Sequence, residues 1–433
     1  MKLGWYSELT PLERRTFFAA FGGLALDSMD TTIYALVTPT LIAVLGITRP
    51  EAGLLATANL IGAGFGGWIA GILADRFGRI RILQATILLV AVSTFAAAFA
   101  QGFWYLMAAR AVQGMGYGGE AAVGAVLVAE VVKASMRGRV AAAIQSGYAV
   151  GNAFSVALLP IVFGFAPREI AFRIFFAIGL LPAIAVFFVR QFVPESKIFT
   201  DDMASRATKS EAPLSPWTIF YPRYIGRTFV ATLFTTGVLG AAYVLITWLP
   251  TYVQSVLKMP ISQTAGYLGV NIFGSFCGPL AFGFLADRIG RRPSFMIFLI
   301  LQALNVVAYT QMSIGPTTTV ILGFFLGAFQ GGLASGLMPT FSELFPTEIR
   351  ATGAGFALSA GRGFGSFVPA AVGWFSTSMP LGDAMAMCAG AGYVVAFIAA
   401  LALRETSGVD LRAVDQEENL SPNTLPHTAS PQS

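Results

Sequence analysis

Five ionisable side chains lie inside long apolar runs of the sequence, where a charge is unusual. They are Asp27, Asp30, Arg110, Glu120 and Arg362. On insertion scales a charge at the centre of a membrane helix costs about 2.5 to 3.5 kcal/mol, so the five together would cost on the order of 12 to 18 kcal/mol if unpaired. We therefore expect them to face a polar cavity or one another. The single histidine, His427, lies in a polar tail, so proton chemistry falls to the carboxylates.

Two of these carboxylates are separated by one helical turn. Asp27 and Asp30 are spaced i, i+3, which places them at neighbouring positions on one helix face. Two carboxylates so close in a low dielectric do not both ionise readily, so at least one is expected to take up a proton. We predict that Asp27, Asp30 and Glu120 are candidates for a coupled proton. The alternative is that a carboxylate only caps or bonds a neighbouring helix.

Arg362 is a different kind of candidate because a guanidinium stays protonated even when buried. Its planar fork matches a carboxylate, and Gly361, Gly363 and Gly365 beside it leave its head accessible. At 1.5 Å per residue, Arg362 lies ~16 Å and Asp27 ~15 Å inside their helices, which is near the middle of a bilayer. We predict that Arg362 binds an organic anion, and the alternative is a permanent ion pair with a protein carboxylate.

Tyrosine and amide side chains at the same depth indicate a mixed polar and aromatic pocket. The predicted substrate contacts besides Arg362 are Tyr34, Tyr148, Asn152 and Tyr243. Polar amides in membrane helices are at least as often bonds between helices. Both interpretations apply to a further set of amides: Asn59, Gln145, Asn271, Gln302, Asn305 and Gln330.

The composition indicates an integral membrane protein. Of 433 residues, 55% are hydrophobic and 11% charged, against about 25% charged in an average soluble protein. Twelve runs reach the roughly 20 apolar residues that cross a bilayer. Their predicted limits are 17–45, 52–74, 80–101, 103–132, 138–165, 170–192, 225–253, 262–285, 293–312, 317–343, 351–377 and 381–404. This excludes a soluble enzyme, and 27 cations spread over the chain form no nucleic-acid-binding patch.

No cofactor and no metal site is predicted from the polar residues. Cys277 and Cys388 both lie in apolar runs, which supports neither a disulfide nor a thiolate metal site. Zinc spacing, a phosphate loop and a nucleophile triad are all missing from the sequence. The glycine-rich stretch 114–119 lies inside a hydrophobic run, so we interpret it as a close-packing helix face and not as a dinucleotide site.

The distribution of cations predicts the orientation. Most of the 27 lie in segments on the same side of the membrane as the N-terminus. The four on the opposite side are Arg49, Arg168, Arg173 and Lys258. By the positive-inside rule, both termini are cytoplasmic. We predict an all-α polytopic protein with two six-helix bundles around a central cavity. Its parts are an N-terminal bundle at 1–192, a cytoplasmic linker at 193–224, a C-terminal bundle at 225–404 and a disordered cytoplasmic tail at 405–433.

Two loop motifs occur twice in the chain. Residues 71–79, Gly-Ile-Leu-Ala-Asp-Arg-Phe-Gly-Arg, return 212 residues later at 283–291 with two substitutions. Glu130 with Arg137 returns 213 residues later as Glu343 with Arg350. Two motifs with nearly the same offset indicate a duplicated six-helix half. Glycine at the start of the first motif would also let a neighbouring helix approach closely.

On these motifs the sequence resembles the major facilitator superfamily over residues 17–404. Residues 26–30, 118–120, 193–196 and 361–363 make it similar to the metabolite:proton symporters, a group with aromatic acid, sialate/lactate and niacin-type carriers. The resemblance implies that the loop residues latch a cytoplasmic gate. The predicted gating residues are Gly71, Asp75, Arg76, Gly78, Arg79, Glu130, Arg137, Asp287, Arg288, Arg291, Glu343 and Arg350. Arg110 follows the superfamily's Arg-x-x-Gln-Gly pattern, with coupling or buried pairing as its role.

We therefore expect a monomeric secondary transporter of the inner (plasma) membrane. Its predicted partners are a small organic anion, a proton and the lipid bilayer, with uptake by alternating access and no enzymatic activity. Three alternatives stay open. They are a sugar or polyol:proton symporter, since Pro194-Glu195-Ser196 also occurs in sugar porters, a proton-coupled drug exporter, and a membrane receptor with a transporter-like fold.

Overall fold

The chain folds almost entirely into long helices, and a computed structural model describes residues 8–133, 137–180, 184, 216–312, 315–346 and 349–405. The first set of helices is α2 (Pro11–Leu45), α3 (Arg49–Phe77), α4 (Arg79–Ala97), α5 (Phe103–Val131), α6 (Arg137–Phe165) and α7 (Arg168–Ile178). The second set is η1 (Pro216–Phe220), α10 (Pro222–Ser255), α11 (Ile261–Ile289), α12 (Arg291–Gln311), α13 (Pro316–Leu344), α14 (Arg350–Gly365), α15 (Val368–Phe375) and α16 (Leu381–Ala402). Within the described residues, nine helices are long and apolar enough to cross a membrane.

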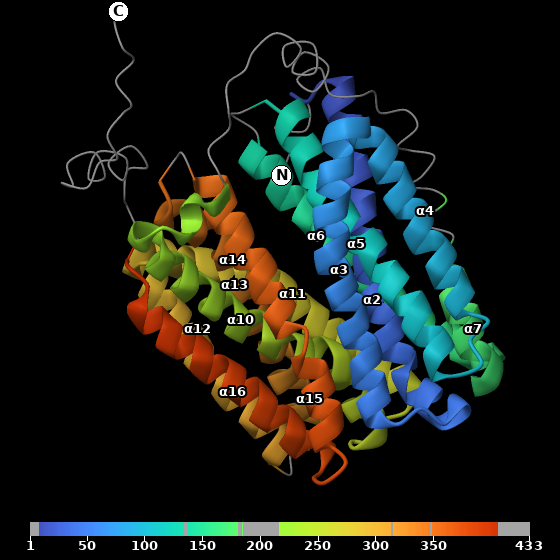
Figure 1. The fold of residues 1–433 in the computed structure, drawn as a ribbon. Helices are drawn as coiled ribbons and strands as arrows, with labels where there is room; N and C mark the ends of the chain where they lie inside the picture. The colour runs from blue at the N-terminus through green and yellow to red at the C-terminus, as the bar shows by residue number, and fades with distance from the viewer. Residues whose placement is uncertain are drawn as a thin grey trace, which may run out of the picture.

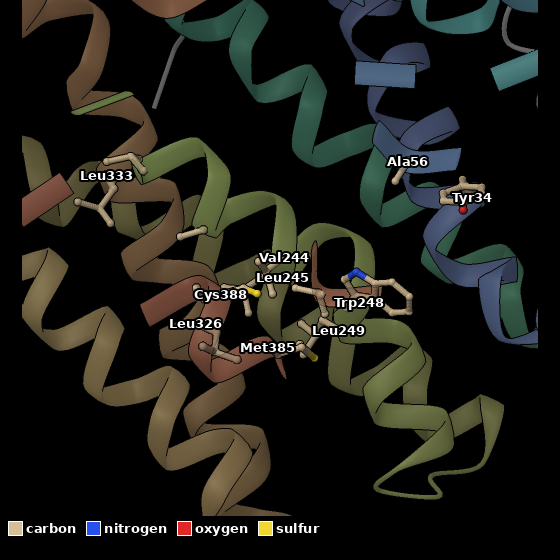
Figure 2. Close-up of a cluster of buried hydrophobic side chains, with 14 of the residues drawn as sticks. Tyr34, Ala56, Val244, Leu245, Trp248, Leu249, Leu326, Leu333, Met385 and Cys388 are labelled. Atoms are coloured by element: carbon tan, nitrogen blue, oxygen red, sulfur yellow. The ribbon is translucent and has the colours of Figure 1, made fainter. Parts of the chain in front are cut away.

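The helices are arranged as two bundles that meet along one side (Figure 1). Helices α2 to α7 pack mainly with one another, as do α10 to α16, and the bundles meet where α2 contacts α10, α6 contacts α11 and α3 contacts α15. The largest cluster of buried hydrophobic side chains crosses this boundary. Figure 2 shows Trp248 of α10 in that cluster, with Tyr34 and Ala56 on the opposite bundle. The indole N–H of Trp248 donates to the Pro369 carbonyl at 3.1 Å.

Equivalent glycines bring the central helices of each bundle into backbone contact. A Cβ added at Gly66 or Gly118 would collide with backbone atoms across the α3–α5 contact. Their counterparts 212 and 213 residues later, Gly278 and Gly331, would collide across the α11–α13 contact. The glycine-rich stretch 114–119 is therefore a close-packing face, as predicted, and the duplication is present in the packing as well as in the loop motifs.

Gly66→Ala is expected to destabilise the protein by about 1 to 3 kcal/mol, because the added methyl must push α3 away from the Met115 backbone of α5. The matched control is Gly64→Ala on the same helix, where a Cβ meets no described atom within 4 Å. Since alanine favours a helix over glycine, the control should unfold at an unchanged or higher temperature. Thermal unfolding of the purified proteins measures both. Equal unfolding temperatures for the two variants would contradict the packing role.

The glycine near the end of the repeated loop motif has a conformational reason. Gly78 has φ +104° and Gly290 has φ +100°, values that residues with a side chain rarely adopt. Each ends one helix, α3 or α11, and the next helix starts at the following residue. The motif's glycine therefore makes the tight turn between two antiparallel helices.

Several predicted limits differ from the observed ones. The first helix begins at Pro11 and not at 17, because Thr10 and Glu13 form a capping box that starts the helix before the apolar run. The eleventh span is divided into α14 and α15, because Pro369 has no N–H for the carbonyl of residue 365. The predicted linker contains η1 and the first turn of α10, and its other residues up to 215 lie outside the described part.

Candidate functional site

A buried arginine joins α5 to α2 in the first bundle. Arg110 of α5 is 2% exposed, and its Nη1 lies 3.9 Å from Asp30 Oδ2 of α2. Nη1 also donates to Gln113 Oε1 at 2.5 Å. The guanidinium carbon lies 4.2 Å from the centre of the Tyr34 ring, in a cation–π contact. Arg110 therefore has a carboxylate, an amide and an aromatic face as partners.

The polar network continues from Arg110 to α3 and α4. Gln113 Nε2 donates to Thr94 Oγ1 at 2.7 Å. The Thr94 hydroxyl in turn donates to Asp30 Oδ1 at 2.9 Å. Asn59 Nδ2 of α3 donates to the Arg110 carbonyl at 3.2 Å. Asp30 is thus held by groups from two other helices. This arrangement supports the buried-pairing interpretation of Arg110 and is equally compatible with a coupling role.

The second intramembrane arginine lies among tyrosines from three helices. Arg362 of α14 is partly accessible, and Tyr243 of α10 lies within range of its charge. Tyr117 of α5, Tyr148 of α6 and Asp27 of α2 lie within range of its charge. The cluster therefore combines groups from both bundles around one permanent cation.

A narrow cavity lies beside this cluster, at the boundary between the bundles. Its lining residues come from α2, α3, α5, α6 and α10: Thr31, Tyr34, Ala35, Ala56, Asn59, Leu60, Arg110, Tyr117, Tyr148, Tyr243, Ile246 and Thr247. The centre of a water-sized sphere can occupy about 30 Å³ of it. Since one water needs about 10 to 15 Å³ by this measure, the cavity holds roughly two waters in this conformation. A larger ligand requires the lining to open.

The predicted pocket residues divide into two groups. Tyr34, Tyr148 and Tyr243 line the cavity, and the Tyr34 hydroxyl donates to the Ala52 carbonyl at 2.6 Å. Their contact with a substrate stays a prediction. Asn152 is instead used between helices, because its Oδ1 accepts from Ser28 Oγ at 2.6 Å and also from the Thr32 hydroxyl.

Amides of the second bundle also bond between helices. Asn271 donates to the Gly323 carbonyl, Gln302 to Leu326 and Asn305 to Leu322. Because each acceptor lies on α13, these side chains tie α11 and α12 to that helix. Of the two interpretations of these amides, the helix-to-helix bond is the one present.

The carboxylates Asp27, Asp30 and Glu120 occupy different surroundings. Asp30 faces Arg110 and Thr94, whereas Asp27 lies in range of Arg362 from the neighbouring turn of the same helix. Glu120, on α5, is 3% exposed and lies in range of Tyr117. The two aspartates are therefore divided between two arginines, which the i, i+3 spacing alone did not indicate.

In the second bundle the loop residues form a chain of ion pairs. Arg291 Nη1 lies 3.5 Å from Asp287 Oδ1, and Arg291 Nη2 lies 3.4 Å from Glu343 Oε1. The Asp287 side chain is 75% exposed. Arg350 is bonded elsewhere, because its Nε donates to the Phe345 carbonyl at 3.3 Å. Exposed pairs of this kind are worth about 0 to 1 kcal/mol. Arg288 packs its guanidinium 4.1 Å from the centre of the Phe284 ring.

The equivalent residues of the first bundle are only partly described. The side chains of Asp75, Glu130 and Arg137 lie outside the described part. Arg76 is exposed and lies over the Phe77 ring, and Arg79 starts α4.

The close helix approach expected at Gly71 is not present. A Cβ there, or at its counterpart Gly283, would meet no described atom within 4 Å. Among the described residues, the ends of α3 and α11 have no close neighbour at these positions, and the gating role of Gly71 stays a prediction.

Contacts between the bundles are tight where α3 begins. Thr57 Oγ1 donates to the Ser366 carbonyl at 2.6 Å, and Arg49 Nη1 donates to the Ser376 carbonyl at 3.3 Å. A Cβ at Gly53 would lie 2.5 Å from the Pro369 carbonyl oxygen. The bundles are therefore closed at this end by backbone-to-backbone packing of α3 against α14 and α15.

Sequence reasoning did not identify three residues of the site: Thr94, Gln113 and Tyr117. Thr94 and Gln113 connect Asp30 to Arg110. Tyr117 lies within the glycine-rich stretch and lines the cavity, while the glycines on either side of it pack against α3 and α4. The sequence contained a signal for two of them, because Gln113 follows Arg110 by one turn and Tyr117 precedes Glu120 by one turn.

Comparison with known proteins gives one family and several relatives. The profile described as Major Facilitator Superfamily matches residues 20–369 and 270–425. A probable 4-methylmuconolactone transporter of Cupriavidus pinatubonensis is 36% identical over 96% of both chains. A cis,cis-muconate transport protein of Acinetobacter baylyi is 27% identical over 90% of this chain and 94% of that one.

Solved structures show the same fold at lower sequence identity. The xylose transporter of E. coli in an inward-open conformation superimposes with a TM-score of 0.74 at 18% identity, over 94% of this chain and 99% of that one. The nucleoside transporter NupG superimposes with a TM-score of 0.73 at 15% identity, over 91% and 100% of the two chains. At these identities the likeness is one of fold.

Proposed function

The chain belongs to the major facilitator superfamily and is a multi-pass membrane transporter, and from that premise we propose that it takes up a small organic acid together with a proton. One observation carries the proposal. A permanent cation, Arg362, lies within range of three tyrosines, Tyr243 of one bundle and Tyr117 and Tyr148 of the other. This is a binding site for a carboxylate with a planar carbon skeleton, since guanidinium groups pair with carboxylates and tyrosine rings pack on flat groups.

The named relatives support an organic acid as the substrate. Two of them are described as carriers of 4-methylmuconolactone and cis,cis-muconate, and a third, 28% identical, as a niacin transporter. We propose an aromatic or unsaturated aliphatic acid on this basis. A sugar has no charge to pair with Arg362, and a cationic drug would be repelled by it.

Proton coupling is proposed for the carboxylates of α2 and α5. Asp30 is buried against Arg110, so protonating it would release Arg110 from its counter-charge, and Asp27 lies in range of Arg362. A proton on Asp27 would leave the Arg362 charge to an incoming carboxylate. Substrate and proton would then strengthen each other's binding, as reciprocal coupling requires.

Alternating access is proposed to follow from movement of residues 1–192 against 225–404. With both termini cytoplasmic, the end at which α3 begins is the outer side, and its contacts are closed in this structure. The cytoplasmic loop residues are proposed to latch the opposite end when the outer side opens. Because Asp287 is mostly exposed, its contribution to that latch should be smaller than that of Asp75.

Gly53→Val is expected to favour the outward-open conformation by at least about tenfold, because a side chain there collides with Pro369 and with the Ala370 Cα at 2.8 Å when the outer side is closed. The matched control is Gly64→Val on the same helix, where an added Cβ meets no described atom within 4 Å. The control should leave the conformational equilibrium unchanged.

Spin labels measure this equilibrium directly. Tyr105 and Ser378 are exposed positions at the outer ends of the two bundles and can be labelled in a variant without Cys277 and Cys388. The distance between the labels should lengthen in Gly53→Val and not in the control. If both variants kept the wild-type distance, the α3–α15 contact would not be the outer closure.

Counterflow in proteoliposomes tests the function itself. Vesicles loaded with unlabelled cis,cis-muconate or nicotinate should accumulate the labelled acid from outside, and an inward proton gradient should drive net accumulation. Xylose and a lipophilic cation serve as probes for the alternative transporter classes. Counterflow of xylose or of the cation, with none of the acids, would overturn the proposal.

A further inference from the structure

A second cavity lies at the end of the bundle where α10 begins and α13 and α16 end. It is lined by the first turns of α10, by Leu344 and by Ala402 to Arg404. The centre of a water-sized sphere can occupy about 210 Å³ of it, against about 30 Å³ in the cavity between the bundles. This is ample room for a small polar group. The transport site uses none of these residues.

The cavity carries two cations. Arg227 of α10 lines the cavity and donates from Nη1 to the Leu344 carbonyl at 3.4 Å. Arg404 follows α16 and is exposed. The adjacent acid, Glu405, is directed to the start of α12, where its carboxylate accepts from the backbone N–H groups of Arg291 at 2.8 Å and Arg292 at 3.0 Å. The negative charge nearest in sequence is therefore held at another helix.

The surroundings of the cavity resemble the edge of a bilayer. Trp217, which is 70% exposed, and Tyr221 precede α10, and such aromatic residues are typical of the membrane surface. Phe229 of α10 is 65% exposed, and Leu401 of α16 is 46% exposed. A molecule held by the two arginines would thus have its polar group at the surface and an apolar wall beside it.

We propose that this cavity binds the phosphate group of an anionic phospholipid, with Arg227 and Arg404 as its partners and the acyl chains along the exposed apolar face of α10 and α16. Basic pockets between membrane helices on the cytoplasmic side take acidic lipid headgroups, and the proposed orientation places this end on that side. The shared chemistry is a phosphate ester, which a soluble phosphate could also supply. The apolar wall favours the lipid.

Native mass spectrometry of the full-length protein, titrated with phosphatidylglycerol, tests the site. Arg404→Gln should weaken retention of one lipid by about tenfold or more, since hydrogen bonds to charged groups have that effect. Arg223→Gln is the matched control, because Arg223 is an exposed arginine one turn before Arg227 and does not line the cavity. Val230→Trp fills the cavity while keeping both arginines, and should also abolish retention.

The lipid and soluble sources are separated by competition. Phosphatidylcholine and millimolar inorganic phosphate should each fail to displace the bound phosphatidylglycerol. Displacement by inorganic phosphate at the concentration that saturates the site would assign it to a soluble ligand and overturn the lipid proposal. Equal retention by wild type, Arg404→Gln and Val230→Trp would overturn the site altogether. Transport of the organic acid is measured separately, so failure here leaves the proposed function intact.

Discussion

Arg362→Ala is expected to weaken carboxylate binding by roughly 100-fold or more while the protein still inserts and folds. Two charge-assisted hydrogen bonds from the guanidinium fork would be lost, each worth about 1.5 to 3 kcal/mol. The residue is only partly buried, so its removal should disturb the packing little. Isothermal titration of the purified protein with the transported acid measures the loss, and size-exclusion chromatography reports folding.

Two conservative variants separate charge from geometry. Arg362→Lys should restore only part of the affinity, because an ammonium group lacks the planar fork. Tyr243→Phe keeps the cation and removes a hydroxyl in range of it, so its effect should be smaller, about tenfold. An Arg362→Ala protein that binds the acid as tightly as wild type would show that the arginine serves the structure alone.

The fold could be predicted from the sequence because its signals are strong and repeated. Apolar runs of bilayer length determine the spans, and the duplicated motif at 71–79 and 283–291 determines the two equivalent halves. The break between α14 and α15 was missed because its apolar run continues through it, and hydropathy does not record the missing N–H of Pro369. The early start of α2 was missed for a related reason, since a capping box acts through local hydrogen bonds.

The site could be predicted only as a set of residue types. Charge at membrane depth identified Arg110 and Arg362, but the choice of partners depends on how five helices pack around the cavity. Asp27 and Asp30 are adjacent on one helix face, yet one is in range of Arg362 and the other is paired with Arg110. Tyr117 was missed because it lies among glycines, which indicate close helix packing. Successive residues of a helix point in different directions, so Tyr117 can line the cavity while the glycines beside it pack against other helices.

We expect the ion pair between Asp30 and Arg110 to serve coupling and not stability alone. Replacing a buried ion pair by apolar residues is often neutral or stabilising, so stability alone gives no reason for this one. Arg110 lines the cavity between the bundles, and Asp30 is paired with it. Asp30 is therefore separated from the cavity by one side chain, and we predict that it exchanges its proton through the cavity.

Asp30→Asn is expected to abolish proton-driven accumulation of the acid while exchange across the membrane persists. Asparagine imitates the protonated carboxyl permanently, and exchange of bound for free substrate does not require release of the proton. Arg110 keeps Gln113 and the Tyr34 ring as partners in the variant, so the network should survive. Uptake with and without a proton gradient, and counterflow without one, are measured in the same proteoliposomes.

Asp27→Asn and Glu120→Gln are the matched variants, since each removes one buried carboxylate from the same region. If Asp30 carries the proton, Asp27→Asn should reduce accumulation mainly through weaker substrate affinity, because Asp27 lies in range of Arg362. Loss of accumulation with intact exchange in Asp27→Asn, and normal accumulation in Asp30→Asn, would move the coupled proton to Asp27. Normal accumulation in both aspartate variants would indicate that Glu120 carries the coupled proton. Glu120→Gln should then be the variant that uncouples transport.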